Sequence, residues 1–269
     1  EETHTATAGC PRPMSAALCR REPNLWGCCR PAEDSDLTKE DVAKRETMLG
    51  KMELLNLQSG HGTSSRGQTL KVRLGEHDVT STQELLRHEE YDVADVVLYP
   101  EFDNATLAHD IALIHLRHPA KQRPNIDVVC LPKQGSKFPN TATDTQTHSS
   151  CVITGWGRRS EASEHSVVLK EVTVPLWQNA ACERALRRQF GSRYSLPETS
   201  ICAGAEGRDA CDGDGGGPLV CEQDGQWYQV GVVSFGIGCG RLNTPGVYTR
   251  VSMYEQWITD TVLRHKDGQ

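Results

Sequence analysis

Eleven cysteines constrain the fold of this 269-residue chain more than any other feature. Four lie within the first thirty residues, the next is Cys130, and the other six fall between Cys151 and Cys239. They do not show the paired CxxC spacing of a zinc site, so we expect a disulfide framework made in an oxidising compartment. The odd count leaves one cysteine free or bridged to another chain. The cysteines therefore predict a secreted, extracellular protein, for which we expect no metal ion and no cofactor.

The composition and charge of the chain exclude several classes of function. Hydrophobic residues make up 37% and charged residues 24% of the chain, and 24 residues are glycine, which is typical of a turn-rich globular protein. No apolar run approaches the roughly 20 residues of a membrane helix. The net charge of −7 and the pI near 5.8 argue against nucleic acid, whose binding proteins carry a basic footprint. Lysine and arginine are scattered, so we expect no membrane-binding patch either.

Two further features bear on secretion. The first residues, EETHTATAGC, lack a basic segment followed by an apolar one, so we expect any secretion signal to be absent from this sequence or already removed. Asn104, followed by Ala105 and Thr106, is an acceptor sequence for N-glycans and fits a secreted protein.

Changes in composition divide the chain into three parts. Residues 1–31 form a small cysteine-rich segment, residues 32–60 a charged linker with some helix, and residues 61–269 the main domain. From Leu70 onward, short apolar-rich segments are closed by Gly, Pro, Asn and Asp, a pattern that predicts the strands of a barrel or a sandwich. The predicted strands lie in LKVRLGEHD, VADVVLYP, DIALIHL, SCVITGWG, KEVTVPLW and PLVCEQDGQWYQVGVVSFG.

Two local patterns predict specific structure near the C-terminus. Asp224-Gly225 lies between two apolar runs and predicts a two-residue hairpin turn. Ser252 and Glu255 have the spacing of a capping box at the start of one closing helix. An apolar stripe at fourfold spacing would dock this helix on the barrel. The residues of the stripe are Tyr254, Ile258 and Val262.

The stretch DACDGDGGGPLVC, residues 209–221, is rich in glycine. Glycine is used where the chain needs positive φ or where something must approach the main chain closely. The segment GDGGGPLVC resembles the GDSGGPLVC sequence of trypsin-like serine proteases, and other segments typical of that family occur here in matching order and spacing. They are DIAL at 110–113, VCLP at 129–132, TGWG at 154–157, ICAG at 201–204 and PGVYTRV at 245–251.

The resemblance implies an all-β, chymotrypsin-like double β-barrel with a C-terminal helix and an active site in the cleft between the barrels. The barrel strands that usually carry PW and CGGSL are missing before Leu70, so we expect the first barrel to be incomplete or closed by other residues. The chain also lacks the TAAHC sequence that carries the catalytic histidine. His61 is either a degenerate remnant of that base or a linker histidine, and we favour the linker interpretation because Gly62 replaces the expected cysteine.

The catalytic positions implied by the resemblance are only partly retained. Asp110 fits the aspartate that orients the histidine, and the backbone N–H groups of Gly213 and Gly215 fit the oxyanion donors. Gly215, however, stands where the nucleophilic serine is expected, and acyl transfer needs an oxygen that attacks the carbonyl. An oxyanion hole and substrate binding alone accelerate the reaction about 10³- to 10⁴-fold over its rate in water, whereas complete enzymes commonly reach about 10⁶-fold and beyond. We therefore expect no catalytic function.

Zymogen activation is not expected from this sequence. Members of the family are cut after a basic residue to release an N-terminus such as IVGG, whose ammonium pairs with the aspartate before the serine. Asp214 is that aspartate here, but ETMLG follows Arg45 and matches poorly. A buried carboxylate without a counter-charge is costly, so we expect Asp214 to find another donor in a zymogen-like loop or to lie solvated.

The specificity pocket implied by the resemblance is complete in sequence. Asp209 occupies the position whose carboxylate pairs with an arginine or lysine, and Gly236 and Gly246 match the glycines that keep the pocket open. An arginine could bind Asp209 through two parallel hydrogen bonds. The alternative is that Asp209 faces solvent in a disordered loop. Phe235 replaces the usual tryptophan beside the pocket.

The resemblance also implies disulfides. Cys130 matches the cysteine that tethers the protease domain to its N-terminal region, so its partner is expected among Cys10, Cys19, Cys28 and Cys29. The adjacent pair in WGCCRP resembles the end of a clip domain, a module that precedes many arthropod serine proteases and their inactive homologues. A complete clip domain has more than four cysteines, so a different cysteine-rich leader is the alternative. The implied pairs within the domain are Cys151–Cys221, Cys182–Cys202 and Cys211–Cys239.

These observations favour a secreted, non-catalytic serine protease homologue that acts by protein binding. It would serve as a cofactor, decoy or regulator in an extracellular proteolytic cascade, such as those of arthropod innate immunity, with cascade proteases or their substrates as partners. One alternative is an active trypsin-like endopeptidase that cleaves after arginine or lysine. Another is a poorly folded product without function, if the first barrel is not completed.

Overall fold

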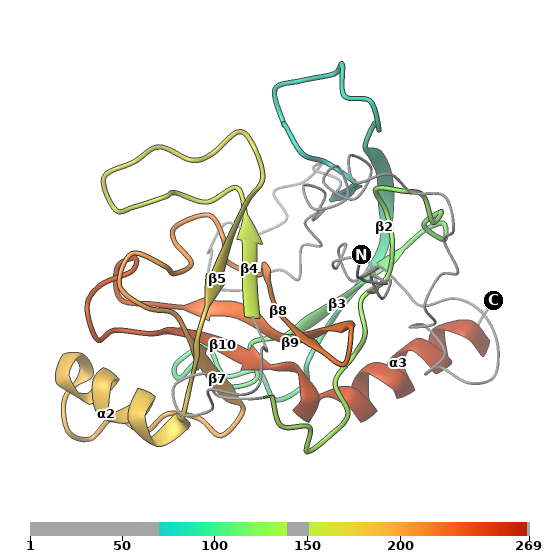
Figure 1. Ribbon diagram of the computed structural model, residues 1–269. Helices are drawn as coiled ribbons and strands as arrows, with labels where there is room; N and C mark the ends of the chain where they lie inside the picture. Colours follow the sequence, from blue (N-terminus) through green and yellow to red (C-terminus); the bar gives the residue numbers. More distant parts are fainter. Residues whose placement is uncertain (1–69, 139–150, 268–269) are drawn as a thin grey trace, which may run out of the picture.

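The computed structural model describes residues 70–138 and 151–267, and the strands of this part of the chain form two antiparallel sheets (Figure 1). The segments 1–31 and 32–60, with His61 and Arg45, lie outside the described residues. The elements are β1 (Lys71–Leu74), β2 (Glu89–Leu98), β3 (Ala112–Leu116), β4 (Cys151–Gly155), β5 (Lys170–Val174), β6 (Leu176–Trp177), α2 (Asn179–Phe190), β7 (Ser200–Ala203), β8 (Pro218–Gln223), β9 (Gln226–Phe235), β10 (Gly246–Arg250), the 3₁₀ turn η1 (Val251–Met253) and α3 (Glu255–Asp267).

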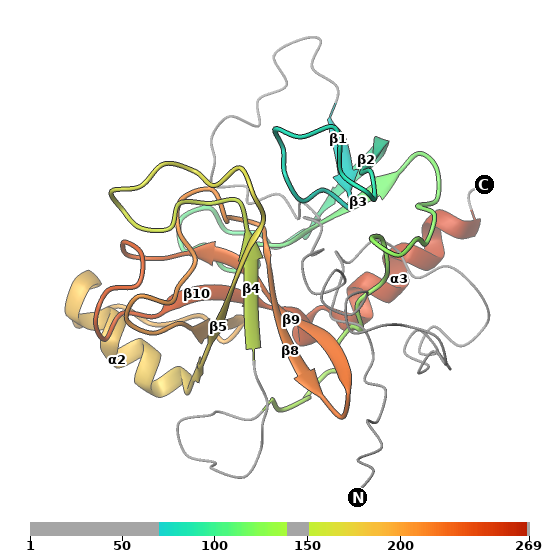
Figure 2. The same cartoon turned by 45° about the horizontal axis from the view of Figure 1, so that its top comes forward.

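The first sheet in this part of the chain has the order β1-β2-β3 (Figure 2). In β1 the side chains alternate between exposed and buried, as expected for a strand with one face on a core. That core is a small apolar cluster beneath the sheet. The prediction that the first barrel is incomplete, or closed by other residues, concerns the chain before Leu70, which lies outside the described residues. The cluster consists of Val72, Leu74, Ile114, Leu116 and Ile126.

The second sheet is larger and nearly closes on itself as a barrel. In the described part of the chain its order is β5-β4-β8-β9-β10-β7-β6, with every neighbouring pair antiparallel. Asp224 and Gly225 both have positive φ, 54° and 74°, and Gln223 pairs with Gln226, so the predicted two-residue hairpin turn is confirmed. The mostly β, chymotrypsin-like architecture predicted from the sequence is therefore confirmed.

The closing helix α3 packs on the second sheet as predicted. Tyr254 and Ile258 are buried against Ile111 and Val232, and Val262 packs beside them. The capping-box prediction was wrong, because the helix begins at Glu255 and Ser252 lies one turn earlier, in η1. No helix in residues 70–138 and 151–267 is both long and apolar enough to cross a membrane.

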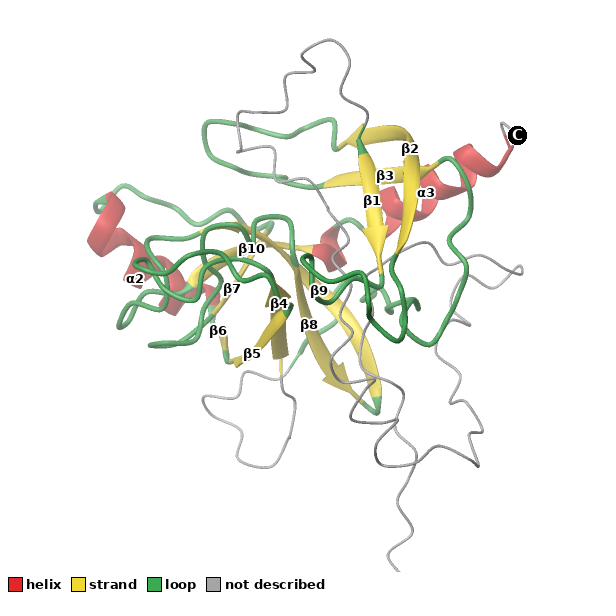
Figure 3. Cartoon of the chain, turned by 90° about the horizontal axis from the view of Figure 1, so that it is seen from above, coloured by secondary structure: helices red, strands yellow, loops and turns green. Residues whose placement is uncertain are grey.

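Helix α2 was not predicted. It lies at the opposite end of the molecule from α3 (Figure 3). Its buried residues, Cys182, Ala185 and Leu186, are spaced three and four apart and so share one face of the helix. The disulfide between Cys182 and Cys202 fixes that face to β7. This apolar stripe is short and relies on a cysteine, which is why periodicity alone did not reveal the helix.

Candidate functional site

Asp110 is buried at the junction between the two sheets. Its carboxylate accepts a hydrogen bond of 2.6 Å from the hydroxyl of Ser234, at the end of β9. Its backbone carbonyl accepts another, of 2.7 Å, from the hydroxyl of Thr249 in β10. Hydrogen bonds to an ionised acceptor are stronger than neutral ones. The second sheet therefore holds Asp110 in place, as expected for an aspartate whose task is to orient another group.

His109 precedes Asp110 and is the histidine nearest to it in sequence. Its ring stacks on Tyr99 with the centroids 5.1 Å apart, and its Nδ1 lies 3.1 Å from the hydroxyl of Tyr254. The backbone at His109 has φ of 58°, a conformation that side chains other than glycine adopt only where surrounding contacts hold it. His109 thus packs between Tyr99 and Tyr254, next to the start of α3.

The carboxylate of Asp214 is held by two backbone donors. One oxygen accepts from the N–H of Gly157 at 2.8 Å, and the other accepts from the N–H of Cys211 at 3.0 Å. An added Cβ at Gly155 or Gly157 would overlap this carboxylate, which explains both glycines of the TGWG segment. Asp214 is therefore fixed by backbone donors of its own loop and of the TGWG segment, and the absence of zymogen activation stays a prediction.

Gly213 and Gly215 lie on the same tight loop. Gly213 has φ of 95°, and an added Cβ there would lie 2.6 Å from Cδ2 of His165. The residue after Gly215 is Gly216, whose N–H donates to the carbonyl of Val233 at 2.9 Å. This bond fixes the loop to β9. Gly215 is half-buried in this braced turn and contributes backbone only. Residue 215 is the position at which the resemblance expects the nucleophile.

Asp209, in the position that the resemblance assigns to the specificity pocket, is half-buried. Its carboxylate accepts hydrogen bonds from the N–H of Ala210 at 2.9 Å and from the N–H of Gly240 at 3.1 Å. An added Cβ at Gly246 would lie 2.7 Å from Oδ1 of Asp209, so only glycine fits, whereas a Cβ at Gly236 would meet only a carbonyl at 3.6 Å. The alternative of a solvent-facing Asp209 in a disordered loop does not describe this arrangement.

Burial is the main influence on the acidity of Asp209. It raises the pKa of this carboxyl from 3.8 to about 6, and the two backbone hydrogen bonds and the charge of Asp214 act as smaller effects in opposite directions. At neutral pH the carboxyl is still largely ionised, but poorly solvated. Such a group gains strongly from a cation placed beside it.

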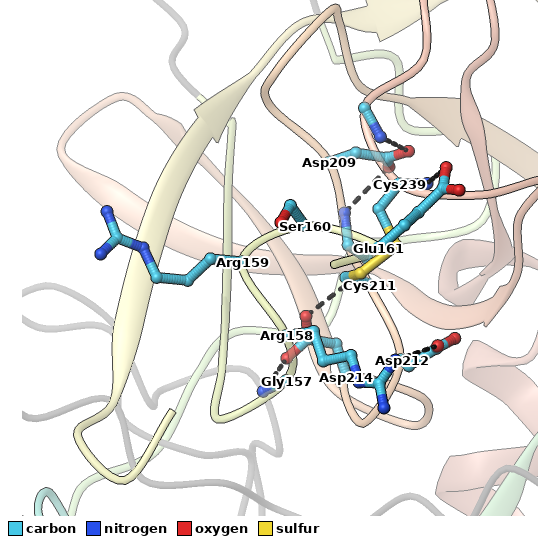
Figure 4. The surroundings of a disulfide bond; sticks show 12 residues. Gly157, Arg158, Arg159, Ser160, Glu161, Asp209, Cys211, Asp212, Asp214 and Cys239 are labelled. Carbon is cyan, nitrogen blue, oxygen red and sulfur yellow. Dashed lines mark hydrogen bonds and ion pairs between the residues drawn. A yellow bond between two sulfur atoms is a disulfide. The ribbon is translucent and has the colours of Figure 1, made fainter. Parts of the chain in front are cut away.

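Disulfides fix the walls of this region. Cys211–Cys239 joins the loop that carries Asp209 to the segment that contains Gly236 and Gly240, and Figure 4 shows the side chains around it. Cys151–Cys221 joins β4 to β8, whose register places these two residues opposite each other. Together with Cys182–Cys202, all three pairs form as the resemblance implies. Cys130 is also disulfide-bonded.

Cys130 is not paired with any of the other six cysteines in the described residues, which are bonded to one another. Its expected partner among Cys10, Cys19, Cys28 and Cys29 lies outside the described residues, so this pairing stays a prediction. Asn104 is exposed in a turn that Asp103 stabilises by accepting hydrogen bonds from Ala105 and Thr106. An exposed turn is where a glycan can be attached, and glycosylation of Asn104 stays a prediction.

Sequence reasoning missed three residues around the pocket. His165 lies on Gly213, and Glu161 pairs with Arg241 at 2.7 Å, next to the Cys211–Cys239 disulfide. Glu161 and Arg241 are 80 residues apart and belong to no motif. Only the folded chain brings them together.

The two sheets, the position of Asp110 between them and the acidic pocket behind a disulfide define a chymotrypsin-like domain. A comparison with family models agrees, since the model described as Trypsin matches residues 57–258. The chain belongs to the trypsin family.

Relatives of the chain include proteins that are named inactive. It is 38% identical over 202 residues to Phenoloxidase-activating factor 2 of Galleria mellonella, covering 72% of this chain and 64% of that protein. It is 40% identical over 204 residues to Inactive CLIP domain-containing serine protease A3 of Aedes aegypti, covering 74% and 41%. It is 36% identical over 212 residues to Inactive CLIP domain-containing serine protease A28 of Anopheles gambiae, covering 78% and 54%. The aligned regions thus span less than two thirds of each of these relatives.

Proposed function

We propose that this chain is a secreted, non-catalytic member of the trypsin family that binds other secreted proteins and thereby regulates an extracellular proteolytic cascade. The observation that carries the proposal is Gly215. At the position where the family resemblance expects the serine, a braced turn offers no side-chain oxygen. Without that oxygen no acyl ester can form, whatever the state of the remaining groups.

The other residues at positions that the resemblance assigns to catalysis are held in place, although the nucleophile is absent. The Asp110–Ser234 contact and the backbone of the loop that contains Gly213 hold their positions. An oxyanion hole and substrate binding alone leave a rate about 10³- to 10⁴-fold above that in water, which is too slow for a physiological protease. A neighbouring hydroxyl does not replace the nucleophile, because that of Ser234 already donates to Asp110.

The relatives support the regulatory part of the proposal. Two of those described above are named inactive clip-domain proteases, and the third is named for the activation of phenoloxidase. On this proposal the chain is of the clip-domain type and acts in arthropod innate immunity. Secretion is supported by the three disulfides within the domain, since disulfides persist in oxidising compartments.

Asp209 supports a specific mode of binding. A half-buried carboxylate that is held by two backbone N–H groups and bordered by glycines offers its negative charge to a cationic side chain. The guanidinium of an arginine can donate two parallel hydrogen bonds to such a carboxylate. The proposed partner is therefore a secreted protein that presents an exposed arginine or lysine, such as a cascade protease or its substrate.

Labelling with an alkyl fluorophosphonate tests the proposal. The probe forms a covalent bond with an activated serine, so the purified chain should remain unlabelled where an equal amount of trypsin is labelled fully. Covalent labelling of the wild-type chain, located by peptide mapping, would overturn the proposal. The matched variant is Gly215→Ser, which returns a hydroxyl to the same loop. Labelling of that variant alone would assign the loss of chemistry to residue 215, whereas an unlabelled variant is the result expected if the TAAHC histidine is also missing.

A further inference from the structure

Residues 158–165 fold into a short hairpin, which we call the strap. Arg158 and His165 form an antiparallel bridge at its base. At its tip the hydroxyl of Ser163 accepts hydrogen bonds from the N–H groups of Arg159 and Ser160, at 2.9 and 3.0 Å. These bonds close the tip, so the strap is a defined element and not a loose loop.

The base of the strap is attached to the loop that carries Gly213. The N–H of Arg158 donates to the carbonyl of Asp212 at 2.9 Å, and their charged groups lie 3.7 Å apart. At the other end of the base, the ring of His165 rests on the α-carbon of Gly213, where an added Cβ would lie 2.6 Å from it. Both ends of the strap therefore contact the loop that contains Asp212 and Gly213.

The tip of the strap is attached to a second segment, residues 238–241. Both carboxylate oxygens of Glu161 accept from the guanidinium of Arg241, at 2.7 and 2.8 Å, and one also accepts from the N–H of Cys239 at 3.2 Å. The ion pair lies directly on Gly238, since an added Cβ there would overlap both of its members. Figure 4 shows Glu161 beside the Cys211–Cys239 disulfide.

This attachment is directly coupled to the pocket. The N–H of Cys239 donates to Glu161 on the strap, and the next N–H, of Gly240, donates to Asp209 in the pocket. Residues 238–241, which we call the wall, thus donate backbone hydrogen bonds to both carboxylates. The exposed Gly236 lies on the rim just before this wall. The strap therefore contacts both segments whose N–H groups donate to Asp209, the loop of residues 209–213 and residues 238–241.

Building on the proposed cation-binding role of Asp209, we propose that the Glu161–Arg241 pair is a latch that makes the pocket select small free cations over arginines carried on a polypeptide. A free amidine needs only the pocket. An arginine within a chain must also place its neighbouring residues along the rim, where the strap and the ion pair lie. The latch must open before such a partner can bind fully.

The strength of the latch fits this role. Each member of the pair is about half exposed, and exposed ion pairs contribute little to stability, so a binding partner can displace it. The hydrogen bonds from Arg241, aided by the N–H of Cys239, lower the pKa of Glu161 to about 2. The carboxylate of the folded chain therefore stays ionised until the pH falls towards 2. Any stability that the lowered pKa contributes is complete above about pH 4.5 and is lost as the pH falls from there towards 2.

Affinity measurements on latch variants test this proposal. Benzamidine and a blocked peptide with a single arginine are titrated into the wild-type chain, Glu161→Gln, Arg241→Gln and the charge-reversed pair Glu161→Arg with Arg241→Glu. Either single variant should tighten peptide binding about two- to fivefold, as expected for loss of an exposed ion pair, and change benzamidine affinity less than twofold. The reversed pair should return the peptide affinity towards the wild-type value. Thermal unfolding confirms that each variant is folded.

The outcomes separate the latch from the function on which it rests. Unchanged peptide affinity in both single variants, or an equal gain for benzamidine and peptide, would overturn the latch while leaving the pocket intact. Failure of the wild-type chain to bind benzamidine, or equal binding by Asp209→Asn, would overturn the cation-binding role of Asp209 and the latch with it.

Discussion

The hydroxyl of Ser234 donates a 2.6 Å hydrogen bond to the carboxylate of Asp110, and both residues are at least 95% buried. The bond connects β9 of the larger sheet to the residue just before β3 of the smaller one. It holds together the site that the resemblance assigns to catalysis, although no nucleophile is expected there. In this chain its effect is on stability.

Ser234→Ala should therefore destabilise the fold. Removal of the donor leaves a buried carboxylate with one hydrogen bond fewer, which costs about 1–3 kcal/mol. Urea denaturation at pH 7 measures the change. The control is Ser192→Ala, at an exposed turn, where a change within about 0.5 kcal/mol is expected. Equal stability of the two variants would show that the Ser234 hydroxyl does not support Asp110.

Benzamidine binding should depend on pH through Asp209. The cation binds the ionised carboxylate, whose pKa in the free chain is about 6, so affinity is high above this value and falls below it. Titration calorimetry should find binding about tenfold weaker at pH 5 than at pH 7, because only about a tenth of the carboxyl groups are ionised at pH 5. The Asp209→Asn variant should bind weakly at both pH values. A pH-independent affinity would contradict the assignment.

The glycines around the pocket should not be equally replaceable. Gly246→Ala would place a methyl group 2.7 Å from the Asp209 carboxylate and 3.2 Å from the ring of Tyr248, and such overpacking costs about 1–3 kcal/mol. Gly236→Ala meets one carbonyl at 3.6 Å and should change stability by less than about 0.5 kcal/mol. Chemical denaturation of the two variants measures both values, and the reverse order would refute this description of the pocket.

The Cys211–Cys239 disulfide should contribute strongly to stability. It closes a loop with a sequence separation of 28, and the chain-entropy estimate for such a loop is about 3–4 kcal/mol. Replacing both cysteines by serine should lower the unfolding temperature and weaken benzamidine binding, because the wall at residues 238–241 is released. Calorimetry and a binding titration on the same samples test both effects. Unchanged benzamidine affinity would show that the backbone alone holds the wall in place.

Much of this fold could be predicted from the sequence because its signals are local. The Asp224-Gly225 turn and the stripe of Tyr254 and Ile258 are short-range patterns, and the structure confirms them. The capping-box prediction was wrong because Ser252 lies in a 3₁₀ turn, where it is buried. Tertiary packing overrode the local preference there.

Some residues of the candidate site could be predicted from the sequence and others could not. Asp209, Asp110 and the glycines were found because each belongs to a segment that resembles the family. Glu161 and Arg241 belong to no such segment, and their contact depends on how two distant loops fold onto each other. The burial that raises the pKa of Asp209 is likewise a property of the folded pocket, so the sequence could not reveal it.

The central claim is that this chain cannot form an acyl ester, and burst titration with a p-nitrophenyl ester that carries a guanidinium group tests it most directly. Because residue 215 has no oxygen to acylate, the purified chain should release no stoichiometric burst of p-nitrophenol, while trypsin in the same buffer releases one equivalent per active site. A burst approaching one equivalent per chain, retained after removal of contaminating proteases, would contradict the claim.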